Sequence, residues 1–174
     1  MIIAKLKAAL IVSAFALIAG VAYADGSGDP TIASSDNGKY ADKDGNPTYK
    51  IHADGTVDWY TFSGYRRYHS DCHVCHGPNG EGSSYAPALA SSLKTLSYGD
   101  FISTVANGRK HVDSANDKVM PSFASNVNVM CHVDDIYVYL RARANDAIPG
   151  GRPPSHEDKP EAAKVAEANC TGIQ

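Results

Sequence analysis

The sequence predicts an all-α domain with a β-hairpin-like N-terminal extension and a C-terminal tail. Three observations indicate this arrangement. Apolar and aromatic residues recur at helical spacing in three segments between residues 59 and 144. Asp-Gly turns separate short β-favouring runs before them, and a stretch rich in proline and glycine follows them. A chain of 174 residues has room for one domain with its own core.

Residues 1–24 are predicted to be a secretory signal peptide. Lys5 and Lys7 form a basic start, an apolar run follows, and Ala22-Tyr23-Ala24 supplies a small-residue cleavage site before Asp25. The apolar run is short for a membrane anchor and ends at this processing site. We therefore expect a mature chain in an oxidising compartment, the bacterial periplasm. No segment of the mature chain is apolar enough to span a bilayer.

The mature chain is acidic. The full sequence has a formal net charge of −3, and removing residues 1–24 takes away Lys5 and Lys7 but no acidic residue, so the charge becomes −5. No run of basic residues occurs in the mature chain. These observations argue against nucleic acid as a partner.

The N-terminal extension, residues 25–58, is polar and rich in turns. Asp44-Gly45 and Asp54-Gly55 lie between short β-favouring runs, which is a hairpin signal. The segment that begins at Asp42 also invites comparison with a calcium-binding EF-hand loop. Such a loop needs glycine at its sixth position and glutamate at its twelfth, where this chain has Pro47 and Ala53. The calcium interpretation is therefore rejected.

The domain itself is assigned to residues 59–144 and the tail to residues 145–174. A helical pattern leads from Phe62 to Cys72, and the segment with the strongest apolar stripe has acidic residues in its first turn and arginines in its last. The predicted helices and loops are as follows: helices over residues 62–72, 96–108 and 129–144, a further short helix over 160–169, and loops over 77–89 and 118–126.

The stretch "CHVCH" carries the chemistry. Cys72 and Cys75 stand three residues apart and His76 follows directly, which is the pattern of covalent haem c attachment with His76 as an iron ligand. His73 is then a variable residue that points away from the iron. A zinc site would need a second pair of ligands at suitable spacing. A thioredoxin-type motif should open a helix after a strand, whereas this one ends a helix.

The second axial ligand of the iron has three candidates. Met120 precedes Pro121, which favours an extended loop that can present a thioether. Met130 lies where the last long helix begins, a position at which methionine usually packs in the core. His111 would give a bis-histidine haem. We favour Met120. Histidine and methionine together fill both axial positions, which suits electron transfer better than oxygen chemistry.

The two remaining cysteines are expected to pair. Of the four cysteines, haem attachment uses two, so Cys131 and Cys170 are left in an oxidising compartment, which favours a disulfide. This bond would tie the tail to the start of the last long helix. The alternative is a free Cys170 on a mobile tail.

The motifs taken together resemble those of a class I c-type cytochrome. They are, in order, "GYRRYHSDCHVCHG", "APAL", "VANGR", "MPSF" and "DDIYVYLRAR". The resemblance implies that Gly64 lets the N-terminal helix cross closely over the C-terminal one, at Ile136 and Tyr139. It also implies that the carbonyl of Pro87 accepts a hydrogen bond from His76. The residues expected to wall the haem are Leu89, Phe101, Val105 and Phe123.

A closer resemblance covers about residues 40–160. The block "WYTFSGYRRYHSDCHVCHGPNGEGSSYAPALA", the two extra cysteines and a "GRPP" tail are similar to the four-cysteine cytochromes of methanol metabolism. This implies a monomeric carrier, not an enzyme. Its electron donor would be a PQQ-dependent alcohol dehydrogenase that uses a lanthanide or calcium, and its acceptor a downstream cytochrome c or an oxidase.

Other functions stay open at this point. The chain would also fit a general periplasmic electron shuttle or a haem subunit of a dehydrogenase complex, and a small haem enzyme or sensor would need an open iron site. For the carrier, we expect one haem edge near the surface, flanked by residues 77–84 and 120–126. The net charge of −5 favours a donor with a basic docking surface.

Overall fold

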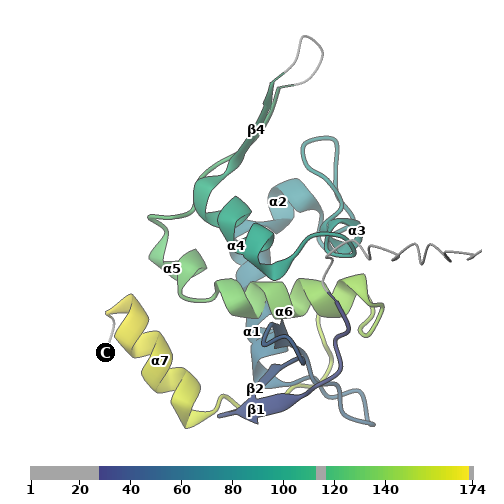
Figure 1. Ribbon diagram of the computed structural model, residues 1–174, viewed down its shortest axis with the longest axis vertical. Coiled ribbons are helices and arrows are strands. Elements are labelled where there is room, and N and C mark those ends of the chain that lie inside the picture. The colour runs from purple at the N-terminus through teal and green to yellow at the C-terminus, as the bar shows by residue number, and fades with distance from the viewer. Residues whose placement is uncertain (1–27, 113–116, 173–174) are drawn as a thin grey trace, which may run out of the picture.

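The computed structural model describes residues 28–112 and 117–172 (Figure 1). The predicted signal peptide, residues 1–24, lies outside this range. Within it, no helix is long and apolar enough to cross a membrane. The described elements are, in chain order, β1 (Ser34–Asp36), β2 (Lys39–Ala41), β3 (Pro47–Thr48), α1 (Trp59–Asp71), α2 (His73–His76), α3 (Leu89–Ser92), α4 (Tyr98–Asn107), β4 (Arg109–Val112), β5 (Asp117–Met120), α5 (Val127–Met130), α6 (Val133–Ala144) and α7 (Glu161–Thr171).

The core forms where α1 crosses α6, which runs through the middle of the molecule in Figure 1. α1 begins at Asp58, whose side chain accepts a hydrogen bond from the backbone N–H of Thr61. Tyr68 of α1 and Tyr139 of α6 are both fully buried, with ring centroids 5.4 Å apart. Aromatic pairs at this distance pack favourably, so this contact stabilises the crossing of the two helices.

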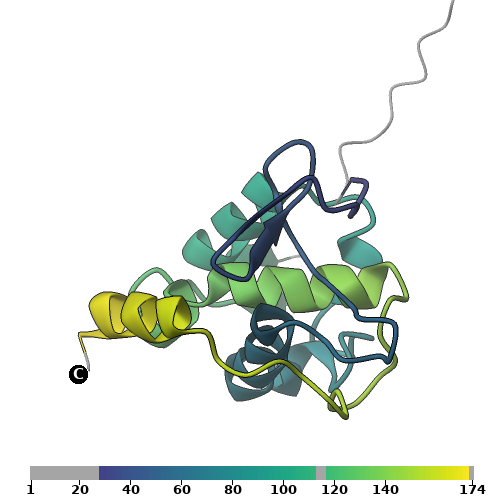
Figure 2. The same ribbon diagram turned by 90° about the horizontal axis from the view of Figure 1, so that it is seen from below.

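The N-terminal extension forms an antiparallel three-stranded sheet with the order β1-β2-β3. The predicted turn at Asp44-Gly45 joins β2 to β3, and Tyr40 pairs with Thr48. The second predicted turn, Asp54-Gly55, lies inside a bridge between Ile51 and Val57. Figure 2 shows this sheet against α6, with α7 beside α5 near one end of the same helix.

A buried arginine holds the extension to α6. Arg141 is fully buried, and its guanidinium donates to the carbonyl oxygen of Pro47 at 2.9 Å and to a carboxylate oxygen of Asp42 at 2.8 Å. Asp42 also accepts hydrogen bonds from the backbone N–H groups of Asp44 and Asn46. The residue at which a calcium loop would have begun is therefore one partner of a buried ion pair. Removal of either partner would leave an uncompensated buried charge.

Among the differences from the predicted elements, two concern the segments on either side of Pro121. The helix expected over residues 129–144 is divided into α5 and α6, with Cys131 and His132 between them. The expected loop over residues 118–126 is wrong at its start, because Asp117–Met120 form β5, which pairs with β4. The pre-proline position keeps Met120 extended, as predicted, but this extended backbone continues into a strand. α7 confirms the short helix expected near residues 160–169.

Candidate haem-binding site

The haem-attachment motif occupies the end of α1 and the single turn of α2. The backbone N–H of Cys72 donates to the carbonyl of Tyr68 and closes α1. The N–H groups of Cys75 and His76 then both donate to the carbonyl of Cys72. Two thiols and one imidazole are thereby fixed on adjacent turns. Cys72 is partly buried, whereas Cys75 is exposed.

His76 is buried and oriented by the loop that follows it. Its Nδ1 atom lies 2.9 Å from the carbonyl oxygen of Pro87. A carbonyl only accepts, so Nδ1 carries the proton and donates, which leaves the lone pair of Nε2 available to a metal. The loop can bring Pro87 this close because Gly82 has a φ of 86°, and a Cβ there would lie 2.7 Å from the backbone nitrogen of Ala88. This geometry is the one that the family resemblance implies.

An apolar cavity opens beside His76. All four predicted haem-wall residues and Met120 line it. The lining residues are Cys72, His76, Leu89, Phe101, Thr104, Val105, Met120, Phe123, Val129, Ile136 and Leu140. The donor set suits haem c, because the thiol of Cys72, an imidazole and a thioether all border this apolar cavity.

The three candidates for the second axial ligand lie at different places relative to the cavity. Met120 lines it, whereas His111 is exposed on β4 and neither His111 nor Met130 is among the lining residues. Met130 is instead partly buried against the hydrophobic core. The assignment of Met120 as the second axial ligand stays a prediction.

The backbone around Met120 is held by the end of α4. Gly108 ends this helix with a φ of 72°, and a Cβ there would lie 2.5 Å from the carbonyl oxygen of Met120. Beyond Met120, the N–H of Phe123 donates to the carbonyl of Val105 at 3.1 Å. Carbonyls in the last turn of a helix have no partner within the helix, so the loop satisfies them while it positions Met120.

Burial favours the neutral forms of the Cys72 thiol and the Tyr68 hydroxyl. Burial raises the pKa of the Cys72 thiol to about 12. A neutral thioether sulfur suits this environment better than a thiolate would. Burial also raises the pKa of Tyr68, whose hydroxyl donates to the carbonyl of Gly77 directly after His76. Tyr68 therefore remains a donor and supports the loop that orients the histidine.

Sequence reasoning missed four residues that line the cavity. Ile136 and Leu140 lie on the helix with the strongest apolar stripe, but the sequence does not indicate that they line the cavity. Thr104 follows Phe101 at a spacing of three, so the helical period would have found it. Val129 lies on α5, and only the break before α6 places it at the cavity.

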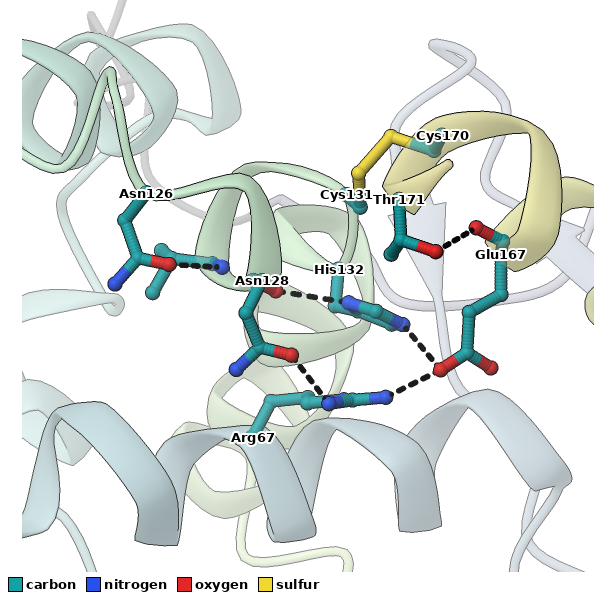
Figure 3. Close-up of a disulfide and its surroundings, with 9 residues drawn as sticks. Arg67, Asn126, Asn128, Cys131, His132, Glu167, Cys170 and Thr171 are labelled. Atoms are coloured by element: carbon teal, nitrogen blue, oxygen red, sulfur yellow. Dashed lines mark hydrogen bonds and ion pairs between the residues drawn. A yellow bond between two sulfur atoms is a disulfide. The ribbon is translucent and has the colours of Figure 1, made fainter. Parts of the chain in front are cut away.

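The structure joins Cys131 to Cys170 by a disulfide, which ties α7 to the segment between α5 and α6 (Figure 3). Beside it, a carboxylate oxygen of Glu167 accepts from Arg67 at 2.7 Å and lies 3.5 Å from Nε2 of His132. Burial lowers the pKa of His132, and hydrogen bonding from Lys159 lowers the pKa of Glu167. The disulfide and these contacts link α7 to α1 and to the wall segment that contains Val129.

These features are typical of one class of protein: a small helical domain to which haem is attached covalently through a Cys-x-x-Cys-His motif beside an apolar cavity. No family model matches the chain. It is 50% identical over 142 residues to cytochrome c-553I of Paracoccus denitrificans, covering 82% of this chain but only 63% of that protein, less than two thirds of its length. It is 38% identical over 96 residues to cytochrome c-555 of Methylococcus capsulatus (strain Bath), covering 55% of this chain and 72% of that protein.

A solved structure is also similar. The crystal structure of the c-type cytochrome XoxG from Methylobacterium extorquens AM1 superposes with a TM-score of 0.75 at 56% sequence identity, covering 81% of this chain and 86% of that one. The chain belongs to the c-type cytochromes. It therefore binds covalently attached haem c, as the sequence predicted.

Proposed function

We propose that the protein is a periplasmic one-electron carrier that accepts electrons from a PQQ-dependent methanol or alcohol dehydrogenase and passes them to a downstream cytochrome c or an oxidase. His76 and Met120 are its axial iron ligands, and Cys72 and Cys75 its haem attachment sites. This proposal rests mainly on one observation, which is that His76 and Met120 line the same apolar cavity. With both axial positions filled by protein, the iron has no open site for substrate or oxygen.

The surface near the attachment motif supports electron exchange with a docked partner. Val74, between the two attachment cysteines, is 76% exposed, and Tyr85, in the loop that ends at Pro87, is 75% exposed. Exposed apolar side chains next to the attachment turn favour a haem edge that a partner can approach closely. Transient redox complexes use small contacts of this kind.

The electron balance fits a one-electron carrier. Haem iron supplies a single Fe³⁺/Fe²⁺ couple, whereas oxidation of an alcohol to an aldehyde releases two electrons and two protons. Two carrier molecules therefore serve each turnover of the dehydrogenase, and the protons are released to solvent. The choice of donor rests on the resemblance of residues 40–160 to the four-cysteine cytochromes of methanol metabolism.

Stopped-flow reduction of the ferric holoprotein tests this function. A PQQ alcohol dehydrogenase encoded beside the chain should reduce it much faster than an unrelated quinoprotein does at equal concentration. The rate should change with salt, because exposed charges are screened beyond about 8–10 Å at physiological ionic strength. Equal rates with both donors, flat across salt, would reduce the assignment to a general periplasmic shuttle. Co-elution with the dehydrogenase on size exclusion would instead indicate a permanent subunit.

A further inference from the structure

The hairpin of β4 and β5 grows directly out of the haem site. α4, which contributes Phe101 and Val105 to the cavity, ends at Gly108, and β4 begins at the next residue. β5 returns along it and ends at Met120, which lines the cavity. In Figure 1, β4 reaches away from the helices. Both ends of the hairpin are thus attached to the cavity wall while its strands extend outward.

The strand register assigns charges to one face of the hairpin. Arg109 pairs with Met120, and His111 pairs with Lys118. Residues directly opposite each other in an antiparallel pair share a face, and alternate residues along a strand do too. Arg109, His111 and Lys118 therefore lie on the same face as Met120. Lys110 and its partner Val119 lie on the other face.

Three long basic side chains of the described strands face solvent. Arg109, Lys110 and Lys118 are exposed, and none of the ion pairs between described residues involves them. Arg109 and Lys118 are diagonal neighbours on one face, and like charges at neighbouring cross-strand positions repel each other instead of stabilising the strand pair. A basic stripe in a chain with a formal net charge of −3 therefore points to a charge outside the molecule.

We propose that the Met120-side face of the β4–β5 hairpin docks on an acidic surface of the electron-donating dehydrogenase. This inference rests on the proposed function and specifies its contact surface. It reverses the expectation drawn from net charge, because charges act at a docked contact over roughly a Debye length, about 8–10 Å. Near Met120 that local charge is positive. Complementary charges at such a contact mainly raise the association rate.

Two charge reversals on the same hairpin test the face. Lys118→Glu changes the Met120-side face, and Lys110→Glu makes the same change in net charge on the opposite face. In stopped-flow reduction by the dehydrogenase at low salt, Lys118→Glu should lower the second-order rate constant about tenfold, and Lys110→Glu by less than about twofold. The two rates should converge at high salt. The visible spectrum and the reduction potential of both variants should match the wild type, which shows that the haem site is intact.

The other outcomes overturn the proposal. Equal slowing by both variants would mean that only net charge matters, and no slowing by either would mean that the hairpin does not dock. If Lys118→Glu slows oxidation by the downstream acceptor but leaves reduction by the dehydrogenase unchanged, the surface belongs to the acceptor. Failure of the proposed function is recognised separately, in the wild type, by equal reduction with cognate and unrelated donors.

Discussion

Gly64 of α1 lies directly against the backbone of α6 at Asp135. A Cβ placed on Gly64 would lie 1.8 Å from the carbonyl oxygen of Asp135 and 2.9 Å from the Cβ of Tyr139. The close crossing implied by the family resemblance is therefore present, with Asp135 rather than Ile136 as the nearest neighbour beside Tyr139. The carbonyl of Asp135 is part of the backbone, and the Cβ of Tyr139 is bonded directly to it. Neither atom can therefore move away from an added Cβ unless a helix shifts.

Gly64→Ala should therefore destabilise the holoprotein by about 3 kcal/mol or more, since overpacking a tight contact forces backbone shifts. The matched control is Gly99→Ala in α4, where nothing lies within 4 Å of an added Cβ. That variant should be neutral or slightly stabilising, because alanine favours a helix over glycine by up to about 1 kcal/mol. Denaturant unfolding followed by far-UV circular dichroism measures both. Similar midpoints for the two variants would contradict the close crossing.

Met120→Ala should open the iron site. The weak sulfur-to-iron charge-transfer band of the ferric protein should disappear, and the reduction potential should fall, because methionine ligation raises the potential. Met130→Ala is the matched control, since Met130 packs against the core without lining the cavity. Met130→Ala should keep the band. Only its unfolding free energy should fall, by no more than about 2–5 kcal/mol, because Met130 is only partly buried. Loss of the band in Met130→Ala alone would show that the wrong methionine was chosen.

The motif residues could be read from the sequence because covalent chemistry restricts them. Cys72, Cys75 and His76 have the spacing that attachment requires, and Pro121 fixes the extended backbone at Met120. Contacts made between distant segments leave no local signal. The buried ion pair between Arg141 and Asp42 is one example. A basic residue in the last turn of a helix looks the same in the sequence whether it is buried or exposed.

The β4–β5 hairpin shows the same limit. Its described strands contain charged residues at adjacent positions and little apolar alternation. Neither the helical period nor the strand period of apolar residues therefore predicts them. The two strands are positioned by the close approach of Gly108 to the backbone of Met120. A Cβ added at Gly108 would lie 2.5 Å from the carbonyl oxygen of Met120. That contact joins residues twelve apart and becomes visible only when the chain is folded.

Asp135 should make the stability of the protein depend on pH. Burial raises its pKa to about 7 from a model-compound value of 3.8, and Ser63 donates to it at 2.6 Å. Between about pH 4 and pH 7 the folded state thus holds a proton that the unfolded state has released. The contribution of this group to stability is therefore present at low pH and lost as the pH rises to about 7, by up to about 4 kcal/mol.

Asp135→Asn removes this dependence, because an amide cannot ionise and its oxygen still accepts from Ser63. The difference in unfolding free energy between the variant and the wild type should favour the variant increasingly from about pH 4 to about pH 7 and level off above that. Urea unfolding at a series of pH values measures that difference, and comparison with the wild type cancels the other titrating groups. A difference that stays constant over this range would show that Asp135 is ionised throughout.

The disulfide between Cys131 and Cys170 should stabilise the fold without tuning the haem. It closes a loop with a sequence separation of 39, for which chain entropy alone gives about 4 kcal/mol. Replacing both cysteines by serine should lower the unfolding free energy by about that amount. The haem spectrum should be unchanged, because neither sulfur lines the cavity.

Val165→Ala provides the matched control, because Val165 lies on α7 but is 53% exposed, so its truncation should cost less than about 1 kcal/mol. Release of α7 should also separate Glu167 from Arg67 and His132. His132 would then lose a carboxylate neighbour that favours its charged form, and its pKa should fall further. Titration of His132 by NMR in the serine double variant measures that fall. Titration of two free thiols in the unreduced, denatured wild type would show that the bond does not form, and the expected loss of stability would then have no basis.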